Sequence, residues 1–115
     1  MDGATVERVA TIVLRRNDGD FVALMKSAND EFLDPTFEHS LATYLRSDAD
    51  LVKAWSVWSG DQRWTPSAYA NGTECGWYDA GYEHVRQHRD AADATADFIH
   101  RLAAWLADRR VIGSD

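Results

Sequence analysis

The sequence predicts an α+β fold in which N-terminal helices and a long C-terminal helix pack with a small antiparallel sheet. Apolar residues recur at helical spacing near both ends of the chain, while the middle is rich in Trp and Tyr and resembles strands. The length of 115 residues suits one hydrophobic core. We therefore expect a single domain over 1–115, with a mainly helical part at 1–47, a sheet at 51–88 and a helix at 90–110.

The N-terminal third is compatible with two structures. Apolar residues from Val6 to Val13 have helical spacing, but the β-branched run Thr11-Ile12-Val13 suits a strand equally well. The turn at 17–20 fits either a hairpin or a break between two helices. We expect helices at 4–16 and 20–29, because the apolar residues of the second segment continue the helical spacing.

Two further helices have clear start signals. At Asp34, the carboxylate can cap a helix that runs to Arg46, with Pro35 at its first position. At Asp90, a second cap precedes a long amphipathic segment that ends near Arg110. The sequence therefore predicts helices over 34–46 and 90–110.

The middle of the chain predicts the sheet. Leu51 to Trp58 is short and rich in Trp and Val, which is typical of a strand, and a further short strand is expected near 64–70. The segments 74–79 and 82–88 flank a short connection that contains Gly81, as in a hairpin. Together these segments predict an antiparallel sheet that the C-terminal helix covers.

The net charge of −7 is concentrated in one segment. Residues 17–50 hold eight acidic residues against two basic ones, a net charge of −6. Such an acidic field repels nucleic acid and anionic membranes and speeds encounter with a basic partner, although a charge of this size also simply favours solubility. We interpret the acidic segment as one part of a partner-binding surface, with Asp30, Glu31 and Asp34 as candidate contacts.

Aromatic residues are clustered between residues 55 and 82. Seven of the 13 Phe, Trp and Tyr residues lie there: Trp55, Trp58, Trp64, Tyr69, Trp77, Tyr78 and Tyr82. Most rings of this kind are core, but a small sheet needs only one aromatic face for packing, and Trp, Tyr and Arg dominate binding hot spots. The second part of the predicted partner-binding surface therefore comprises Trp58, Asp61, Arg63, Trp64 and Tyr69.

A polar row on the last strand is an alternative ligand site. If 82–88 is a regular strand, Tyr82, His84, Arg86 and His88 point to one face, where they could bind an anion or small ligand. The two histidines would lie about 13 Å apart along the strand, too far to share a metal ion. Cys75 is the only cysteine, and packing is the more common role of a lone cysteine than nucleophilic chemistry. We expect no metal site, no cofactor and no catalytic residues.

These features favour a non-enzymatic acidic domain that binds and neutralises a basic protein. In general character the chain is similar to the immunity proteins of bacterial toxins and to phage-encoded inhibitors, although no motif specific to either is present. The alternatives are a small oligomeric enzyme or anion-binding domain that uses the histidine row, and a homodimer formed through the aromatic face. We expect a cytoplasmic protein with no membrane segment, because no apolar run approaches 20 residues and no signal-peptide pattern is present.

Overall fold

The computed structural model describes residues 3–14, 21–56, 67–78 and 82–113. At 21–22, 67–69, 71, 77–78, 82–84 and 108–113 it describes the backbone alone. The elements, in chain order, are α1 (Gly3–Ala10), α2 (Phe21–Ala28), the 3₁₀ helix η2 (Asn29–Leu33), α3 (Phe37–Arg46), α4 (Ala49–Ser56), β1 (Ser67–Asn71), β2 (Glu74–Tyr78), β3 (Tyr82–Gln87) and α5 (Ala91–Gly113).

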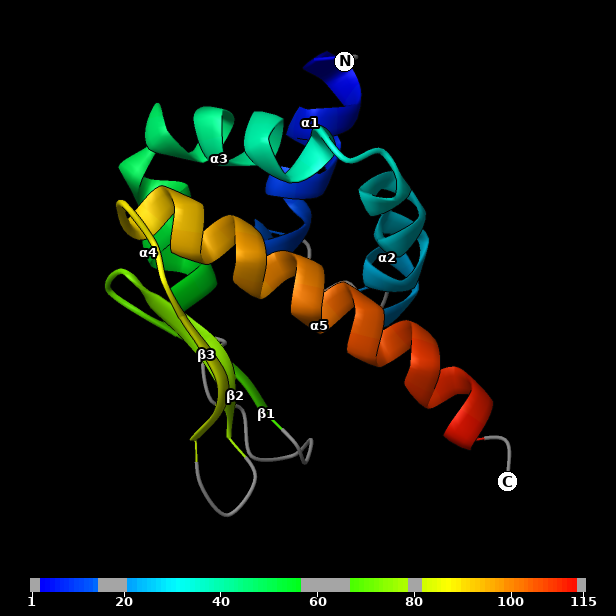
Figure 1. The fold of residues 1–115 in the computed structure, drawn as a ribbon. Coiled ribbons are helices and arrows are strands. Elements are labelled where there is room, and N and C mark those ends of the chain that lie inside the picture. The colour runs from blue at the N-terminus through cyan, green and yellow to red at the C-terminus, as the bar shows by residue number, and fades with distance from the viewer. Residues whose placement is uncertain (1–2, 15–20, 57–66, 79–81, 114–115) are drawn as a thin grey trace.

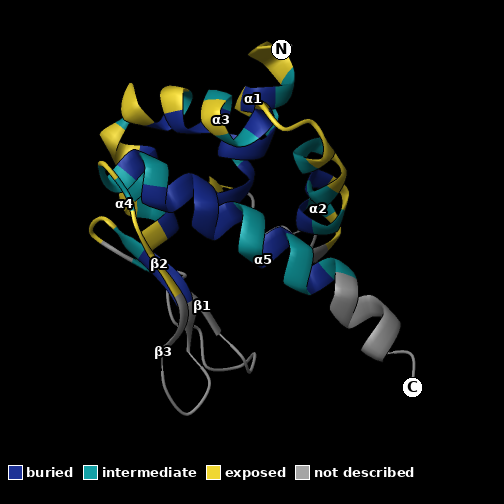
Figure 2. Cartoon of the chain, viewed as in Figure 1, coloured by how far each residue is buried: buried dark blue, intermediate teal, exposed yellow. Residues whose placement is uncertain are grey.

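Helix α5 crosses the middle of the molecule between two groups of elements. Figure 1 shows it running diagonally, with α1, α2 and α3 on one side and the sheet on the other. It packs against α2, α3 and α4 and against strands β1 and β2. Its buried side chains meet those of α3, and Figure 2 shows the continuous buried surface along the first half of α5. The α+β fold predicted from the sequence, with a long C-terminal helix packed on the rest, is confirmed.

Helices, not a hairpin, form the described parts of the N-terminal third. Helix α1 ends at Ala10 and a short 3₁₀ turn follows at 12–14, where Ile12 and Val13 are buried. Helix α2 then occupies 21–28, with Met25 fully buried. The helical alternative is therefore correct for these ranges, and the predicted turn at 17–20 lies outside the described residues. None of the described helices is long and apolar enough to cross a membrane.

Helix α3 begins at Phe37, later than the predicted start at Asp34. The Oδ1 atom of Asp34 accepts hydrogen bonds from the backbone N–H of Thr36 at 2.9 Å and from its hydroxyl at 2.8 Å. These bonds hold residues 34–36 in a turn that precedes the helix, so Asp34 caps the turn and Pro35 lies within it. The predicted end at Arg46 is correct.

The strand predicted for Leu51–Trp58 is wrong over its described part, which belongs to helix α4. Asp48 starts this helix, because its Oδ1 and its backbone carbonyl both accept from the N–H of Leu51. Leu51 and Trp55 are buried one helical turn apart, and the Trp55 indole N–H donates to the Ala10 carbonyl at 2.9 Å. The indole thereby satisfies a carbonyl left without a partner at the end of α1. Residues 57 and 58 lie outside the described residues.

The sheet has the strand order β1-β2-β3, with both pairs antiparallel. Strands β1 and β2 form a hairpin whose turn contains Gly72 at φ 62°, a conformation that glycine adopts without strain. The register shifts between the pairs Cys75↔Arg86 and Trp77↔Glu83, so β3 carries one more residue than β2 at this point. This bulge interrupts the alternation of side chains along β3.

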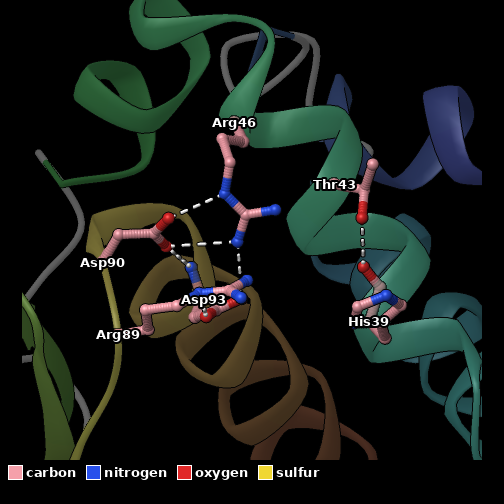
Figure 3. A network of polar contacts seen from close by, with 6 residues as sticks. All are labelled: His39, Thr43, Arg46, Arg89, Asp90 and Asp93. Carbon is pink, nitrogen blue, oxygen red and sulfur yellow. Dashed lines mark hydrogen bonds and ion pairs between the residues drawn. The ribbon is translucent and has the colours of Figure 1, made fainter.

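An arginine on α3 fixes the start of α5. Arg46 Nε lies 2.7 Å from Asp90 Oδ2, and Arg46 Nη2 lies 2.9 Å from Asp93 Oδ1, as Figure 3 shows. Asp90 is also the predicted N-cap of α5, since its Oδ1 accepts from the backbone N–H of Asp93 at 2.9 Å. The hydrogen bonds from Arg46 and from the Asp93 backbone lower the pKa of Asp90 to about 2. The end of α3 is thus tied to the beginning of α5.

Candidate partner-binding surface

The structure contains two groups of polar side chains that merit consideration as functional sites. One is a largely buried cluster between β3 and α5, and the other is the acidic surface of η2 and the turn after it. The first group is paired and largely buried, whereas the second is largely exposed to solvent.

The buried cluster is centred on Asp97 of α5, whose side chain is 5% exposed. His88, just after β3, places its Nε2 2.8 Å from Asp97 Oδ2, and Arg101 places its Nε 2.9 Å from Asp97 Oδ1. Burial raises the pKa of Asp97, but the hydrogen bonds from Arg101 and His88 outweigh that effect and hold the pKa below its usual value. Asp97 therefore remains ionised and joins the end of the sheet to the central helix.

Cys75 lies in the same cluster, on the central strand. It is fully buried, and desolvation together with the neighbouring Asp97 carboxylate raises the pKa of its thiol to about 12. A thiol is nucleophilic as the thiolate, and at neutral pH this one stays protonated. The cluster thus has the environment of a structural anchor, in which Cys75 is packed and His88 is bound to Asp97.

The bulge in β3 breaks up the predicted row of Tyr82, His84, Arg86 and His88. Strict alternation would give Val85 and Arg86 opposite faces with different burial, yet both are exposed. The extra residue in β3 separates 82–83 from 86–88, and His88 turns to Asp97. The predicted alternation is therefore interrupted within the row, and His88 is bound to Asp97. The side chains of Tyr82 and His84 lie outside the described ones, and a ligand role for these residues stays a prediction.

The acidic residues singled out from the sequence lie on η2 and the turn that follows. Asp30 and Asp34 are exposed, and Glu31 is half-buried with its Oε1 3.3 Å from Arg8 Nη2 on α1. Hydrogen bonds from the Thr36 backbone and hydroxyl lower the pKa of Asp34. The three carboxylates thus lie on one short stretch of chain, and Asp30 and Asp34 face solvent without a basic partner in the described part of the chain.

An exposed leucine stands among these carboxylates. Leu33 is 82% exposed, the largest value among the described large hydrophobic side chains, and it lies between Glu31 and Asp34 in the chain. An exposed leucine by itself is ordinary, but an apolar side chain within an acidic segment combines the two properties of a binding surface for a basic protein. We name Asp30, Glu31, Leu33 and Asp34 the η2 surface.

Aromatic contacts hold η2 rigidly against the helices beneath it. The ring of Phe32 stacks on His100 of α5 with centroids 4.3 Å apart, and meets the ring of Phe37 edge-on at 4.9 Å. His100 is itself held by Glu38, whose Oε1 lies 2.9 Å from its Nδ1. Because Phe32 is anchored, its neighbour Leu33 is directed outward from a fixed backbone. Such preorganisation lowers the entropy cost of binding.

Sequence reasoning identified the carboxylates of this surface and missed the leucine. The usable signal was local: three acidic residues flank Phe32-Leu33, and a short 3₁₀ helix exposes one of two successive apolar side chains. Of the predicted aromatic part, Trp58, Asp61, Arg63 and Trp64 lie outside the described residues, as does the side chain of Tyr69. The structure therefore brings Asp30, Glu31 and Asp34 together and leaves the aromatic part a prediction.

Comparisons of the chain with protein-family models, with curated protein sequences and with solved structures gave no match. Among the described residues, no three His, Cys, Asp or Glu side chains are grouped so that they could hold a metal ion.

Proposed function

We propose that this protein is a non-enzymatic interaction domain that binds a basic partner protein through the η2 surface. The observation that carries the proposal is the exposed side chain of Leu33 between Glu31 and Asp34, on a backbone anchored by Phe32. The carboxylates steer the approach of a basic surface, and the leucine supplies apolar contact area once the two surfaces meet.

Charge supports a different protein as partner over a second copy of this chain. Two copies that meet through this surface would bring Asp30 and Asp34 near their equivalents, and each chain carries a net charge of −7. Like charges in an interface oppose association. A basic surface with an apolar pocket for Leu33 would attract these carboxylates instead of repelling them. Inhibition of that partner, as by an immunity protein, is the biological role that we propose for such a complex, in the cytoplasm.

The test compares two variants that are matched in size and charge. The surface variant carries Asp30→Asn and Leu33→Ser. The control variant carries Leu14→Ser and Asp50→Asn, which change another leucine, 66% exposed, and another exposed aspartate away from η2. Each variant loses one negative charge and one exposed leucine, so only the location differs.

The wild type and both variants are immobilised and exposed to a lysate of the source organism. A protein that the wild type and the control retain, and the surface variant does not, is purified and its Kd is measured at low and high salt. We expect a basic protein whose Kd rises about tenfold or more in the surface variant and also rises with salt. Equal loss of binding in both variants, or a partner without a basic surface, would contradict the proposal.

Sedimentation of the purified chain decides between a basic partner and self-association. We expect a monomer at micromolar concentration for the wild type and both variants. A dimer that dissociates in the surface variant alone would replace the basic partner with a second copy of the chain.

A further inference from the structure

An open groove lies between α1 and α3. It has a volume of about 320 Å³ and is lined by Gly3 and Val6 of α1 and by His39, Ser40, Thr43 and Tyr44 of α3. This is at the lower end of the range for ligand pockets, which is roughly 300–1,000 Å³. The groove is therefore large enough for one long side chain and small for an extended ligand.

The lining includes an aromatic side chain, and a carboxylate is hydrogen-bonded to it. Tyr44 is half-buried, so its ring offers apolar surface, whereas Val6 is buried in the core. The Tyr44 hydroxyl donates to Glu7 Oε1 at 3.1 Å, which fixes the Glu7 carboxylate beside the ring. The hydroxyl of Thr43 is already bonded to the His39 carbonyl at 3.0 Å, as Figure 3 shows.

The electrostatic field at the Tyr44 end of the groove is negative. Loss of water around the hydroxyl raises the pKa of Tyr44, and the hydrogen bond to Glu7 and the charges of Glu7 and Asp48 raise it further. The arginines of α1 and α3 are already engaged, Arg8 with Glu31 and Arg46 with Asp90 and Asp93. In the described part of the chain, Glu7 and Asp48 have no basic partner. A cation placed here would therefore find an uncompensated carboxylate.

We infer that the groove between α1 and α3 receives an arginine side chain of the basic partner protein. The alkyl part of the arginine would lie in the groove, while its guanidinium would lie beside the Tyr44 ring and pair with the Glu7 carboxylate. Arginine fits better than lysine, because a planar guanidinium can stack on an aromatic ring and bond a carboxylate through two N–H groups. The inference rests on the proposed function, since it names the chemistry that the basic partner presents.

The groove is tested with small probes, independently of any partner. ¹⁵N-labelled protein is titrated with N-acetyl-arginine amide and, separately, with N-acetyl-citrulline amide, the uncharged isostere. We expect amide shifts at residues 3–7 and 39–44 with the arginine probe, and at least about tenfold weaker binding with the citrulline probe. Glu7→Gln keeps an acceptor for the Tyr44 hydroxyl and removes the charge, so it should weaken arginine binding to the citrulline level. Asp50→Asn, the same loss of charge on α4, should leave it unchanged.

Three results would overturn the inference: equal binding of both probes, shifts elsewhere on the molecule, or no shift at about 100 mM probe. The surface variant Asp30→Asn, Leu33→Ser should bind the arginine probe as the wild type does, because its substitutions lie outside the groove. Failure of the groove and failure of the η2 surface are therefore distinguishable. If the groove fails while partner capture still depends on Leu33, the proposed function stands without it.

Discussion

The imidazole of His100 and the phenyl ring of Phe32 lie face to face, with centroids 4.3 Å apart and planes within 1° of parallel. One ring comes from the central helix and the other from the short 3₁₀ helix that carries the proposed binding surface. Glu38 of α3 holds the imidazole from its edge. A segment of five residues, which would be unstable in isolation, is thereby fixed to two helices of the core.

This relationship predicts the effect of His100→Ala. Loss of the stacked pair should lower the free energy of unfolding by about 1 kcal/mol, the usual contribution of an aromatic contact. Hydrogen exchange at the Asp34 amide, which donates to the Glu31 carbonyl, should become faster because η2 is no longer held. His39→Ala, at an exposed histidine of α3, serves as the control and should change neither quantity. Unchanged exchange in His100→Ala would show that η2 is rigid without the stack.

Among the described charged residues, we expect substitution of Asp97 to lower the free energy of unfolding most. Asp97→Ala leaves Arg101 and His88, which are only 14% and 11% exposed, without their carboxylate. Removing one member of such a buried group costs about 3–5 kcal/mol. Chemical denaturation measures this, with Asp97→Asn as a second variant if the alanine variant does not fold. Arg89→Ala, which breaks an ion pair on a side chain 69% exposed, should cost under about 1 kcal/mol. Similar losses in the two variants would mean that the buried cluster contributes little.

The lowered pKa of Asp90 predicts that the folded chain loses stability in acid. Its pKa is lowered from 3.8 to about 2 in the folded chain, chiefly by the hydrogen bond from Arg46. The stabilisation is therefore complete above the unfolded pKa near 4 and is lost as the pH falls through about 2. Asp90→Asn keeps the cap of α5 and removes the charge that Arg46 binds. We expect its deficit in urea midpoint at pH 7 to shrink between pH 4 and pH 2. A deficit that is constant over this range would show that the charge of Asp90 does not cause it.

Cys75 should be almost unreactive in the folded chain. With a thiol pKa of about 12, the thiolate fraction at pH 8 is about one in ten thousand, against about one in four for a free cysteine. Reaction with a disulfide reagent such as dithionitrobenzoate should be at least about a hundredfold slower than in urea-unfolded protein. Rapid labelling without unfolding would show that the buried cluster opens readily, and Asp97→Asn would then be expected to label faster still.

The fold class follows from the sequence because the strongest signals are local. Helix α5 has its cap at Asp90 and its apolar stripe in one continuous segment, so both its start and its buried face were predictable. The start of α3 was not, since the choice between capping a helix and capping a turn depended on where the Thr36 hydroxyl lies. Helix α4 was mistaken for a strand because a run of eight residues with Trp and Val fits both periods. The helix has a cap at Asp48, and its Trp55 indole donates to the carbonyl of Ala10, 45 positions away, a contact that local periodicity does not reveal.

In the candidate site, too, the acidic residues are visible in the local sequence, whereas the exposure of Leu33 depends on a distant contact. Clustered acidic residues are visible in composition alone, so Asp30, Glu31 and Asp34 were identified. The exposure of Leu33 depends on which of two adjacent apolar residues turns inward, and this is set by His100, almost 70 positions away. The histidine row depends on similar information: an extra residue in β3 interrupts the alternation on which the row was predicted, and no residue type in 82–88 signals that bulge.

Helix α5 follows, in the chain, every element that it packs against. During synthesis the described helices and strands before α5 therefore leave the ribosome before the helix that covers part of their apolar surface. The nascent chain should carry exposed Phe37, Leu41 and Cys75 until Ile99 and Leu102 emerge, and it should form its core only then. Until α5 is available, a chaperone would have exposed apolar surface to bind.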